Sequence, residues 1–202
     1  MKKFALSLTI VLLAALFLPC FASATKTLDN LQTAFNGESN ANARYLAFAK
    51  KADEEGYKQA ASLFRAAARA EEIHAQNHAV VIKKLGGVPQ AKIETPVVKN
   101  TGDNLVVAMK GEIYERDVMY PDFIKQARME QNTAALETFN YAKTAEADHA
   151  KLYTHAKDNL AQMKTAGVKY YVCTICGFTT PKIDFEKCPS CFNPKEKYVP
   201  VA

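Results

Sequence analysis

Apolar residues recur every three or four positions over four long stretches of the chain, and this spacing is typical of an amphipathic α-helix. The pattern predicts helices over residues 27–55, 57–85, 103–129 and 132–164. Glycines follow three of these stretches, at Gly56, Gly86 and Gly167, and glycine commonly ends a helix. Pro121 falls inside the third stretch, where its missing N–H and its ring should kink or reshape the helix.

The connection between the second and third predicted helices is long. Residues 86–103 contain three glycines and two prolines and show no helical period. A tight turn between neighbouring helices needs fewer residues, so this segment predicts a crossover. The expected fold class is therefore all-α, a four-helix bundle with a long crossover between helices 2 and 3.

The end of the chain has a different composition. Residues 167–202 hold four cysteines and several prolines and show almost no helical periodicity. The sequence thus predicts a helical domain over residues 25–166 and a small metal-binding module over residues 167–202.

Residues 1–24 have the pattern of a secretory signal peptide. Lys2 and Lys3 precede an apolar run over residues 4–18, and Ala22-Ser23-Ala24 offers a small-residue cleavage site. An uncleaved anchor is the alternative, but the run is short for a membrane span of about 20 residues. We expect cleavage near Ala24, export to the periplasm, and no membrane attachment of the mature chain.

The charge pattern gives no support to nucleic-acid binding. The formal net charge of the full chain is +5, and basic residues alternate with acidic ones without forming a block. A mild balance of this kind is typical of a solvated surface.

A twelve-residue frame, F-x-x-A-x-x-A-E-x-x-H-A, occurs at residues 64–75 and again at residues 139–150. Residues three apart share one face of a helix, so Glu71 with His74 and Glu146 with His149 each present a carboxylate and an imidazole together. A single such pair is common on a protein surface. Its repetition within a longer frame favours two halves of one metal site.

Each half also has a glutamate on the preceding helix. Glu38 precedes Glu71 by 33 residues, and Glu112 precedes Glu146 by 34. Di-iron carboxylate bundles use one Glu from each of two helices and Glu-x-x-His from each of the other two. The candidate ligands are Glu38, Glu71, His74, Glu112, Glu146 and His149.

The residues beside these candidates favour a buried site. Small apolar side chains such as Ala67, Ala70, Ala142 and Ala145 flank the pairs, and burying several carboxylates without cations would cost many kcal/mol. Solvent-facing glutamates are the alternative, which would make the repeat accidental. Carboxylate-rich ligands suit iron or manganese better than zinc alone.

Three motifs give residues 27–202 a resemblance to the rubrerythrins, ferritin-like di-iron proteins with a rubredoxin-like C-terminal domain. They are G-E-S-x-A-x-x-R-Y at residues 37–45, E-E-x-H-A at residues 71–75 and G-E-x-Y-E at residues 111–115. The resemblance implies that Glu115 binds one iron in the oxidised state and that this iron moves to His74 on reduction. It also implies that Tyr45 and Tyr120 hydrogen-bond ligand carboxylates, although an ordinary aromatic core would explain both tyrosines equally well.

Two C-x-x-C knuckles, Cys173 with Cys176 and Cys188 with Cys191, form the second candidate site. This spacing specifies a tetrahedral four-thiolate metal site, and a structural zinc ribbon or a pair of disulfides are the alternatives. The surrounding residues resemble a rubredoxin knuckle pair, which implies one redox-active iron. Phe192 and Asn193 stand where such knuckles usually have glycine, so we expect a less relaxed turn and a phenyl ring that shields the sulfurs.

The resemblance implies an enzyme that reduces hydrogen peroxide to water at a pair of non-haem irons, with electrons relayed through the four-cysteine iron, in defence against oxidative stress. Glu115, His74, Tyr45 and Tyr120 would be its catalytic residues. An iron-storage or ferroxidase protein is the alternative, and a structural zinc protein is a third. The resemblance also implies a homodimer, since in the family the tail, too far from its own bundle, pairs with the di-iron site of a neighbouring chain. The electron donor is unidentified and would be a periplasmic carrier if the chain is exported.

Overall fold

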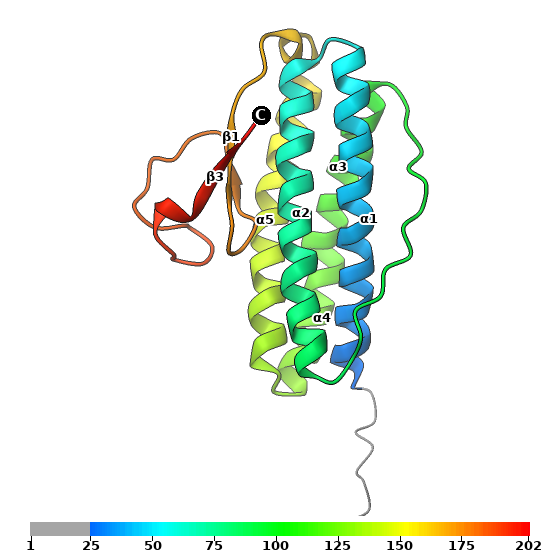
Figure 1. Cartoon of the computed structure of the whole chain (residues 1–202), viewed down its shortest axis with the longest axis vertical. Coiled ribbons are helices and arrows are strands. Elements are labelled where there is room, and N and C mark those ends of the chain that lie inside the picture. The colour runs from blue at the N-terminus through cyan, green and yellow to red at the C-terminus, as the bar shows by residue number, and fades with distance from the viewer. Residues whose placement is uncertain (1–24) are drawn as a thin grey trace, which may run out of the picture.

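Four long helical segments form an antiparallel bundle in the computed structural model, which describes residues 25–202 (Figure 1). The predicted signal peptide lies outside these residues. The third segment has three consecutive parts, so the helices are α1 (Lys26–Glu54), α2 (Lys58–Lys84), α3 (Thr101–Tyr114) with η1 (Glu115–Met119) and α4 (Tyr120–Met129), and α5 (Thr133–Asp158). The prediction of an all-α four-helix bundle is confirmed. No helix in this described part is long and apolar enough to cross a membrane.

The helices begin and end close to the predicted residues, for local reasons. Side chains of Thr25, Asn100 and Asn132 accept hydrogen bonds from the first turns of α1, α3 and α5. Gly56 and Gly86 follow α1 and α2 with φ of +79° and +80°, a conformation that favours glycine. The main difference is at the end of α5, where residues 160–164 form a short 3₁₀ helix, η2 (Leu160–Lys164), instead of continuing the α-helix.

The crossover between α2 and α3 runs along α1 (Figure 1). Gln32, Asn36 and Asn40 are spaced by four residues on α1, and each bonds the crossover backbone. Gln32 donates to the carbonyl of Val88 at 2.6 Å, and the backbone N–H of Lys92 donates to Asn36 Oδ1 at 2.8 Å. A stripe of amide side chains thereby satisfies backbone groups that no helix or sheet would satisfy.

Pro121 reshapes the third segment, as predicted, by means of a π-helical turn. Residues 115–119 form this turn, and the N–H of Tyr120 donates to the carbonyl of Glu115, five residues earlier. A proline ring clashes with the carbonyl four residues before it, and the wider turn avoids that clash. Tyr120 therefore returns to the face of the helix that carries Glu115.

The hydrophobic core is divided into two clusters along the bundle axis. One contains the aromatic side chains Tyr45, Phe48, Phe64 and Tyr153, and the other contains Tyr120 and Phe139. Alanines supply much of the remaining contact and let the helices approach closely. The candidate ligands occupy the layer between the two clusters, where water is excluded from both sides.

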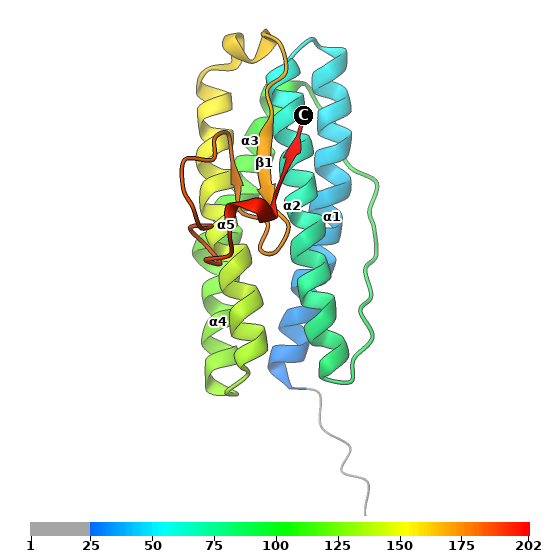
Figure 2. The ribbon, with the colours of Figure 1, turned by 60° about the vertical axis from the view of Figure 1, so that its left-hand side comes forward.

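The C-terminal module is a three-stranded antiparallel sheet with strand order β2-β1-β3, in which β1 is Tyr170–Cys173, β2 Thr179–Thr180 and β3 Tyr198–Val201. A short 3₁₀ helix, η3 (Lys195–Lys197), precedes β3. The module lies on α2 and α5 of its own chain (Figure 2).

Candidate metal centres

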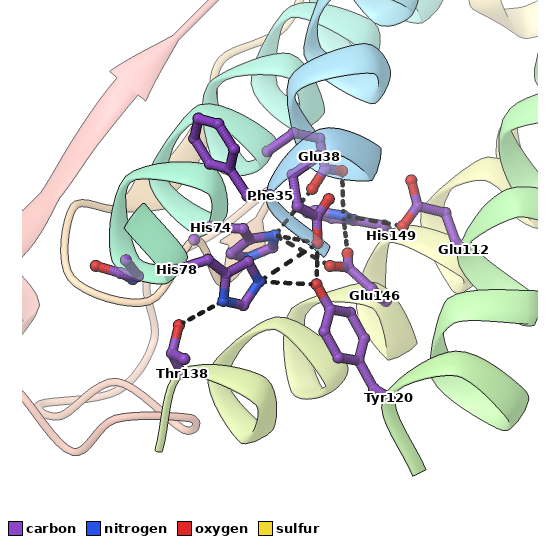
Figure 3. A network of polar contacts seen from close by, with 12 residues as sticks. Phe35, Glu38, His74, His78, Glu112, Tyr120, Thr138, Glu146 and His149 are labelled. Atoms are coloured by element: carbon purple, nitrogen blue, oxygen red, sulfur yellow. Dashed lines mark hydrogen bonds and ion pairs between the residues drawn. The ribbon is translucent and has the colours of Figure 1, made fainter. Parts of the chain in front are cut away.

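The bundle brings six of the predicted ligands together in two overlapping groups (Figure 3). In each group, one ligand atom from every residue lies within 4.8 Å of the others. The groups share Glu71 and Glu146, a geometry suited to two metal ions bridged by two carboxylates. The first group is Glu38, Glu71, His74 and Glu146, and the second is Glu71, Glu112, Glu146 and His149.

Unsatisfied polar atoms show that this donor set fits a pair of cations. All six side chains are buried. Within residues 25–202, carboxylate oxygens of all four glutamates and Nδ1 of His149 make no hydrogen bond. Nδ1 of His149 nevertheless lies 2.8 Å from Glu146 Oε2 and 3.4 Å from Glu112 Oε2. Buried carboxylates that converge on one another are costly unless cations or protons neutralise them.

The pKa values of the same residues reflect this crowding. Burial, together with the charges of Glu71 and Glu146, raises the pKa of Glu112 to about 8. Burial alone would lower the pKa of His74, but the carboxylates of Glu146 and Glu71 raise it to about 10. Burial and then the charge of Glu71 raise the pKa of Glu38 well above its ordinary value. In the metal-free chain these groups therefore hold protons that bound cations would displace.

The outer ring nitrogen of each histidine, Nε2, points away from the carboxylates and is hydrogen-bonded to the C-terminal module. His74 Nε2 lies 3.1 Å from the carbonyl oxygen of Cys176, which can only accept, so Nε2 carries the proton. His149 Nε2 lies 3.1 Å from Thr179 Oγ1, whose own proton is donated to the carbonyl of Gly177. Nδ1 of each histidine therefore faces the carboxylates, 2.8 Å from Glu71 for His74 and 2.8 Å from Glu146 for His149, and would bind a cation once its proton is displaced.

Gly177 permits this close approach. Its φ is +77°, and a Cβ at this position would lie 2.3 Å from His74 Nε2. Asn77 of α2 adds a bond from its Nδ2 to the carbonyl of Ile175 at 2.8 Å. The expectation that the tail lies too far from its own bundle is therefore wrong, because one hydrogen bond joins the cysteine site to a candidate ligand of the same chain. The homodimer stays a prediction without that argument.

Tyr45 and Tyr120 occupy equivalent places in the two halves. The Tyr45 hydroxyl donates to Glu112 Oε1 at 2.5 Å, and the Tyr120 hydroxyl donates to Glu38 Oε1. Burial, followed by the charge of the bonded glutamate, raises the pKa of each phenol well above its usual range. Both tyrosines thus remain protonated donors that orient the carboxylates.

Glu115 lies outside both groups of candidate ligands in the described chain. It starts the π-helical turn and is 9% exposed, whereas the six grouped residues are at most 1% exposed. Its side chain faces a cavity of about 520 Å³ that is also lined by Gly37, Arg44 and Tyr114. The structure therefore shows the arrangement in which His74, and not Glu115, lies among the carboxylates.

The four cysteines form a compact cluster whose sulfurs lie within 4.8 Å of one another. All four are free, and the Cys173–Cys191 and Cys176–Cys188 sulfurs are 3.7 and 3.6 Å apart, well beyond the roughly 2.05 Å of a disulfide. The disulfide alternative is therefore wrong for this structure. The Tyr198 hydroxyl donates to Cys188 Sγ at 3.0 Å and places a donor beside a thiolate.

Phe192 behaves partly as expected. Its φ is +57°, so the turn after the last cysteine is strained for a residue with a side chain. The prediction that its ring shields the sulfurs is wrong, because Phe192 is 72% exposed. Phe178, Tyr198 and Ile175 pack around the cysteines instead.

His78 was missed by the sequence reasoning. It lies one helical turn beyond His74 and is fully buried beside Tyr120 and Thr138. Its position four residues after His74 places it on the same helix face, which was the available signal.

The bundle, its two overlapping carboxylate-histidine groups and the four-thiolate site beside them define a ferritin-like di-iron carboxylate protein with an additional mononuclear iron module. Residues 29–157 match the rubrerythrin family, and the chain belongs to that family.

Individual relatives agree with this assignment. Nigerythrin of Nitratidesulfovibrio vulgaris is 42% identical over 173 residues, with 85% of each chain covered. Rubrerythrin-2 of Clostridium acetobutylicum is 38% identical over 176 residues, covering 85% of this chain and 95% of that protein. The structure of fully reduced, all-ferrous nigerythrin superposes with a TM-score of 0.80 at 39% identity, covering 89% of both chains.

A bacterioferritin of Mycobacterium tuberculosis shares the fold alone, with a TM-score of 0.62 at 20% identity over 67% of this chain and 86% of that one. The ferritin-like fold class, the iron cofactors and membership of a di-iron, rubrerythrin-type family are thus established. The specific reaction is a separate question.

Proposed function

We propose that this protein reduces hydrogen peroxide to water at its di-iron site and receives electrons through the four-cysteine iron. The reaction consumes two electrons and two protons for each peroxide, H₂O₂ + 2 e⁻ + 2 H⁺ → 2 H₂O. One observation carries the proposal, namely the hydrogen bond from His74 Nε2 to the carbonyl of Cys176. A storage protein has no need to connect a redox-active thiolate site to a ligand of its iron pair.

We assign the two groups of buried residues as the ligands of the iron pair, with Glu71 and Glu146 shared between the ions. When bound, a reduced pair of irons supplies the two electrons that cleave the O–O bond. The chain itself fixes the ligand orientations. Tyr45 and Tyr120 hold Glu112 and Glu38, and the module holds His74 and His149 by their outer nitrogens.

The proposed path for electrons consists of the bonds of one residue and a single hydrogen bond. It runs from the sulfur of Cys176 along the backbone of that residue to its carbonyl, across one hydrogen bond of 3.1 Å, and through the imidazole of His74. Gly177 permits the contact, since any side chain there would displace His74.

The cavity at Glu115 gives peroxide a route to the site. It opens between α1 and the π-helical turn, and Glu115 lies between it and the buried carboxylates. Arg44, whose guanidinium lies 5.5 Å from the centre of the Tyr45 ring, places a positive charge on its wall. We propose that Glu115 is the residue that exchanges with His74 as a ligand, because it alone among the predicted ligands of the pair borders both solvent and the site.

Iron storage or ferroxidase activity without peroxide turnover is the second candidate, and the ferritin-like fold favours it. The fold similarity to bacterioferritins is consistent with that alternative but does not account for the docked cysteine module.

The deciding experiment measures metal content, visible absorption and peroxide consumption of the purified protein. We expect iron in both sites and rapid reoxidation of the reduced protein by a stoichiometric amount of peroxide. Zinc without visible absorption would refute the redox role. Iron that is oxidised by oxygen but not by peroxide would favour storage.

The cellular setting can be tested separately. We propose export to the periplasm and a periplasmic electron carrier as the donor. Cell fractionation with an antibody against the chain, together with the mass of its N-terminus, tests both the compartment and cleavage near Ala24. Mature chain in the cytosol would remove the reason for a periplasmic donor.

A further inference from the structure

His78 is a fully buried imidazole that belongs to neither group of candidate ligands. Its Nε2 lies 3.1 Å from the Tyr120 hydroxyl oxygen, and its Nδ1 lies 2.9 Å from Thr138 Oγ1 (Figure 3). The rings of Phe139 and Tyr120 pack against it at centroid distances of 5.5 and 6.0 Å. Both ring nitrogens are thus engaged in one continuous chain of hydrogen bonds.

The bond between Tyr120 and Glu38 fixes the direction of the other hydrogen bonds in this row. The Tyr120 hydroxyl donates to Glu38 Oε1, so its oxygen accepts from His78, and Nε2 carries the imidazole proton. Nδ1 of a neutral imidazole is then an acceptor, and the Thr138 hydroxyl donates to it. All three donors point towards Glu38.

The outer end of the chain reaches the surface. Thr138 is 5% exposed and lines a cavity of about 320 Å³ between α2 and α5, together with Asn77, Lys84, Glu137 and Tyr141. This cavity shares no lining residue with the one that borders Glu115. Water can therefore meet the chain at Thr138 without entering through the peroxide route.

We propose that Thr138, His78 and Tyr120 form a proton relay that carries protons from this second cavity to Glu38 at the di-iron site. The proposal rests on the proposed peroxide reduction, which consumes two protons. Thr138 and His78 act through Tyr120 and are positioning residues rather than catalytic ones.

The proton count balances at each atom. Thr138 passes its proton to His78 Nδ1 and takes another from water, His78 Nε2 passes its proton to Tyr120, and Tyr120 passes its own to Glu38. His78 changes tautomer and stays neutral, Thr138 and Tyr120 are unchanged, and Glu38 gains the one proton that the reaction then consumes. One passage supplies one of the two protons that each peroxide consumes. It leaves the proton of His78 on Nδ1, so the ring must make a half-turn and again present an N–H to Tyr120 before another proton can pass.

The other half of the site provides an internal comparison. Tyr153 follows His149 by four residues, as His78 follows His74, and its ring lies 5.5 Å from that of Tyr45. The Tyr153 hydroxyl is buried and has no hydrogen-bond partner anywhere in residues 25–202. A chain of donors to the surface thus exists on the Glu38 side, and on the Glu112 side it stops at Tyr45.

The first test compares Thr138→Val with Thr138→Ser in the iron-loaded full chain. Valine has the shape of threonine without the hydroxyl, and serine restores the hydroxyl. We expect Thr138→Val to slow reoxidation of the reduced protein by peroxide roughly 10- to 100-fold and to change the solvent deuterium isotope effect, since positioned proton transfer contributes about 10²-fold or more. Serine should restore both quantities. Thr144→Val is the matched control, because Thr144 is exposed on α5 and its hydroxyl donates to the carbonyl of Asn140.

The second test needs no turnover. Nitrogen-15 NMR of the full chain with zinc in place of iron reports the tautomer of His78, which we expect to be neutral with the proton on Nε2. A proton on Nδ1, or equal reoxidation rates for the valine and serine variants, overturns the relay. A wild-type protein that does not react with peroxide overturns the proposed function. The tautomer of His78 would then still show in which direction the hydrogen bonds from Thr138 to Glu38 run.

Discussion

Gly177→Ala is the most direct test of the contact between the cysteine module and the di-iron site. The added Cβ would lie 2.3 Å from His74 Nε2, 2.8 Å from its Cδ2 and 3.2 Å from the carbonyl oxygen of Ala70. None of these atoms can move freely, since the imidazole is buried among carboxylates and the carbonyl belongs to α2. Either the module must withdraw or His74 must leave its position.

The energetic cost has two separable parts. Alanine at a φ of +77° costs about 1–2 kcal/mol relative to glycine, whatever surrounds it. Loss of the bond between His74 and the carbonyl of Cys176 adds about 1 kcal/mol, or about 1–3 kcal/mol if the imidazole N–H is left buried without a partner. Gly56→Ala is the control for the first part, because Gly56 has a φ of +79° and no atom lies within 4 Å of its added Cβ.

The assay mixes the fully reduced protein with peroxide in a stopped-flow instrument and follows the visible absorption of the four-cysteine iron. We expect its reoxidation to be at least tenfold slower in Gly177→Ala and unchanged in Gly56→Ala, although urea unfolding should show a loss of stability in both. Equal reoxidation rates in the two variants, with full iron content, would refute a path through Cys176 and His74.

Three further predictions concern the cysteine module, the two histidines and the protons of the metal-free site. Replacing Phe192 by glycine should stabilise the module by roughly 0.5–1 kcal/mol, since relief of a positive φ exceeds the added freedom of the unfolded chain; a lower urea midpoint for iron release would contradict this. His74→Ala should impair peroxide turnover by disturbing the reduced state, whereas His149→Ala should reduce iron retention in both oxidation states; equal effects on both measurements would disprove the asymmetry assigned to Glu115. The pKa values of about 8 for Glu112 and about 10 for His74 mean that both hold protons at neutral pH, so zinc titration of the metal-free chain should release protons. Its apparent affinity should rise with pH through this range and level off above it, and an affinity that does not change with pH would contradict those values.

The sequence was sufficient to predict the bundle and its six grouped side chains, because both depend on helical spacing. A carboxylate and an imidazole three residues apart share a face wherever the helix packs, and the repeat at Glu71 and Glu146 identified which pairs face inward. Pro121 indicated a distortion of the helix, and the structure shows a π-helical turn there. The position of Tyr120 depends on how this turn accommodates its extra residue, which sequence spacing alone does not specify.

Contacts between distant segments could not be read in the same way. The bond between His74 and Cys176 joins residues that are 102 positions apart, and it depends on the left-handed conformation of Gly177. A glycine after a cysteine knuckle is compatible with many turns, so its role becomes visible only when the imidazole lies against it. For the same reason the ring of Phe192, which follows a cysteine in sequence, proved to be exposed.

The two halves of the repeat have nearly the same ligands but different surroundings, which indicates different roles for the two halves of the site. On the Glu38 side, Tyr120 leads through His78 and Thr138 to a surface cavity, and His74 bonds the carbonyl of a cysteine. On the Glu112 side, the Tyr45 ring packs at 5.5 Å against Tyr153 in an apolar cluster, and His149 bonds a threonine hydroxyl. In the proposed mechanism, protons and electrons enter through the first half, whereas the second half packs against aromatic rings and bonds the module only through the Thr179 hydroxyl. Since the repeated frame is common to both halves, the asymmetry must come from the residue four positions after each histidine and from the module group that meets each Nε2, a backbone carbonyl at His74 and a side-chain hydroxyl at His149.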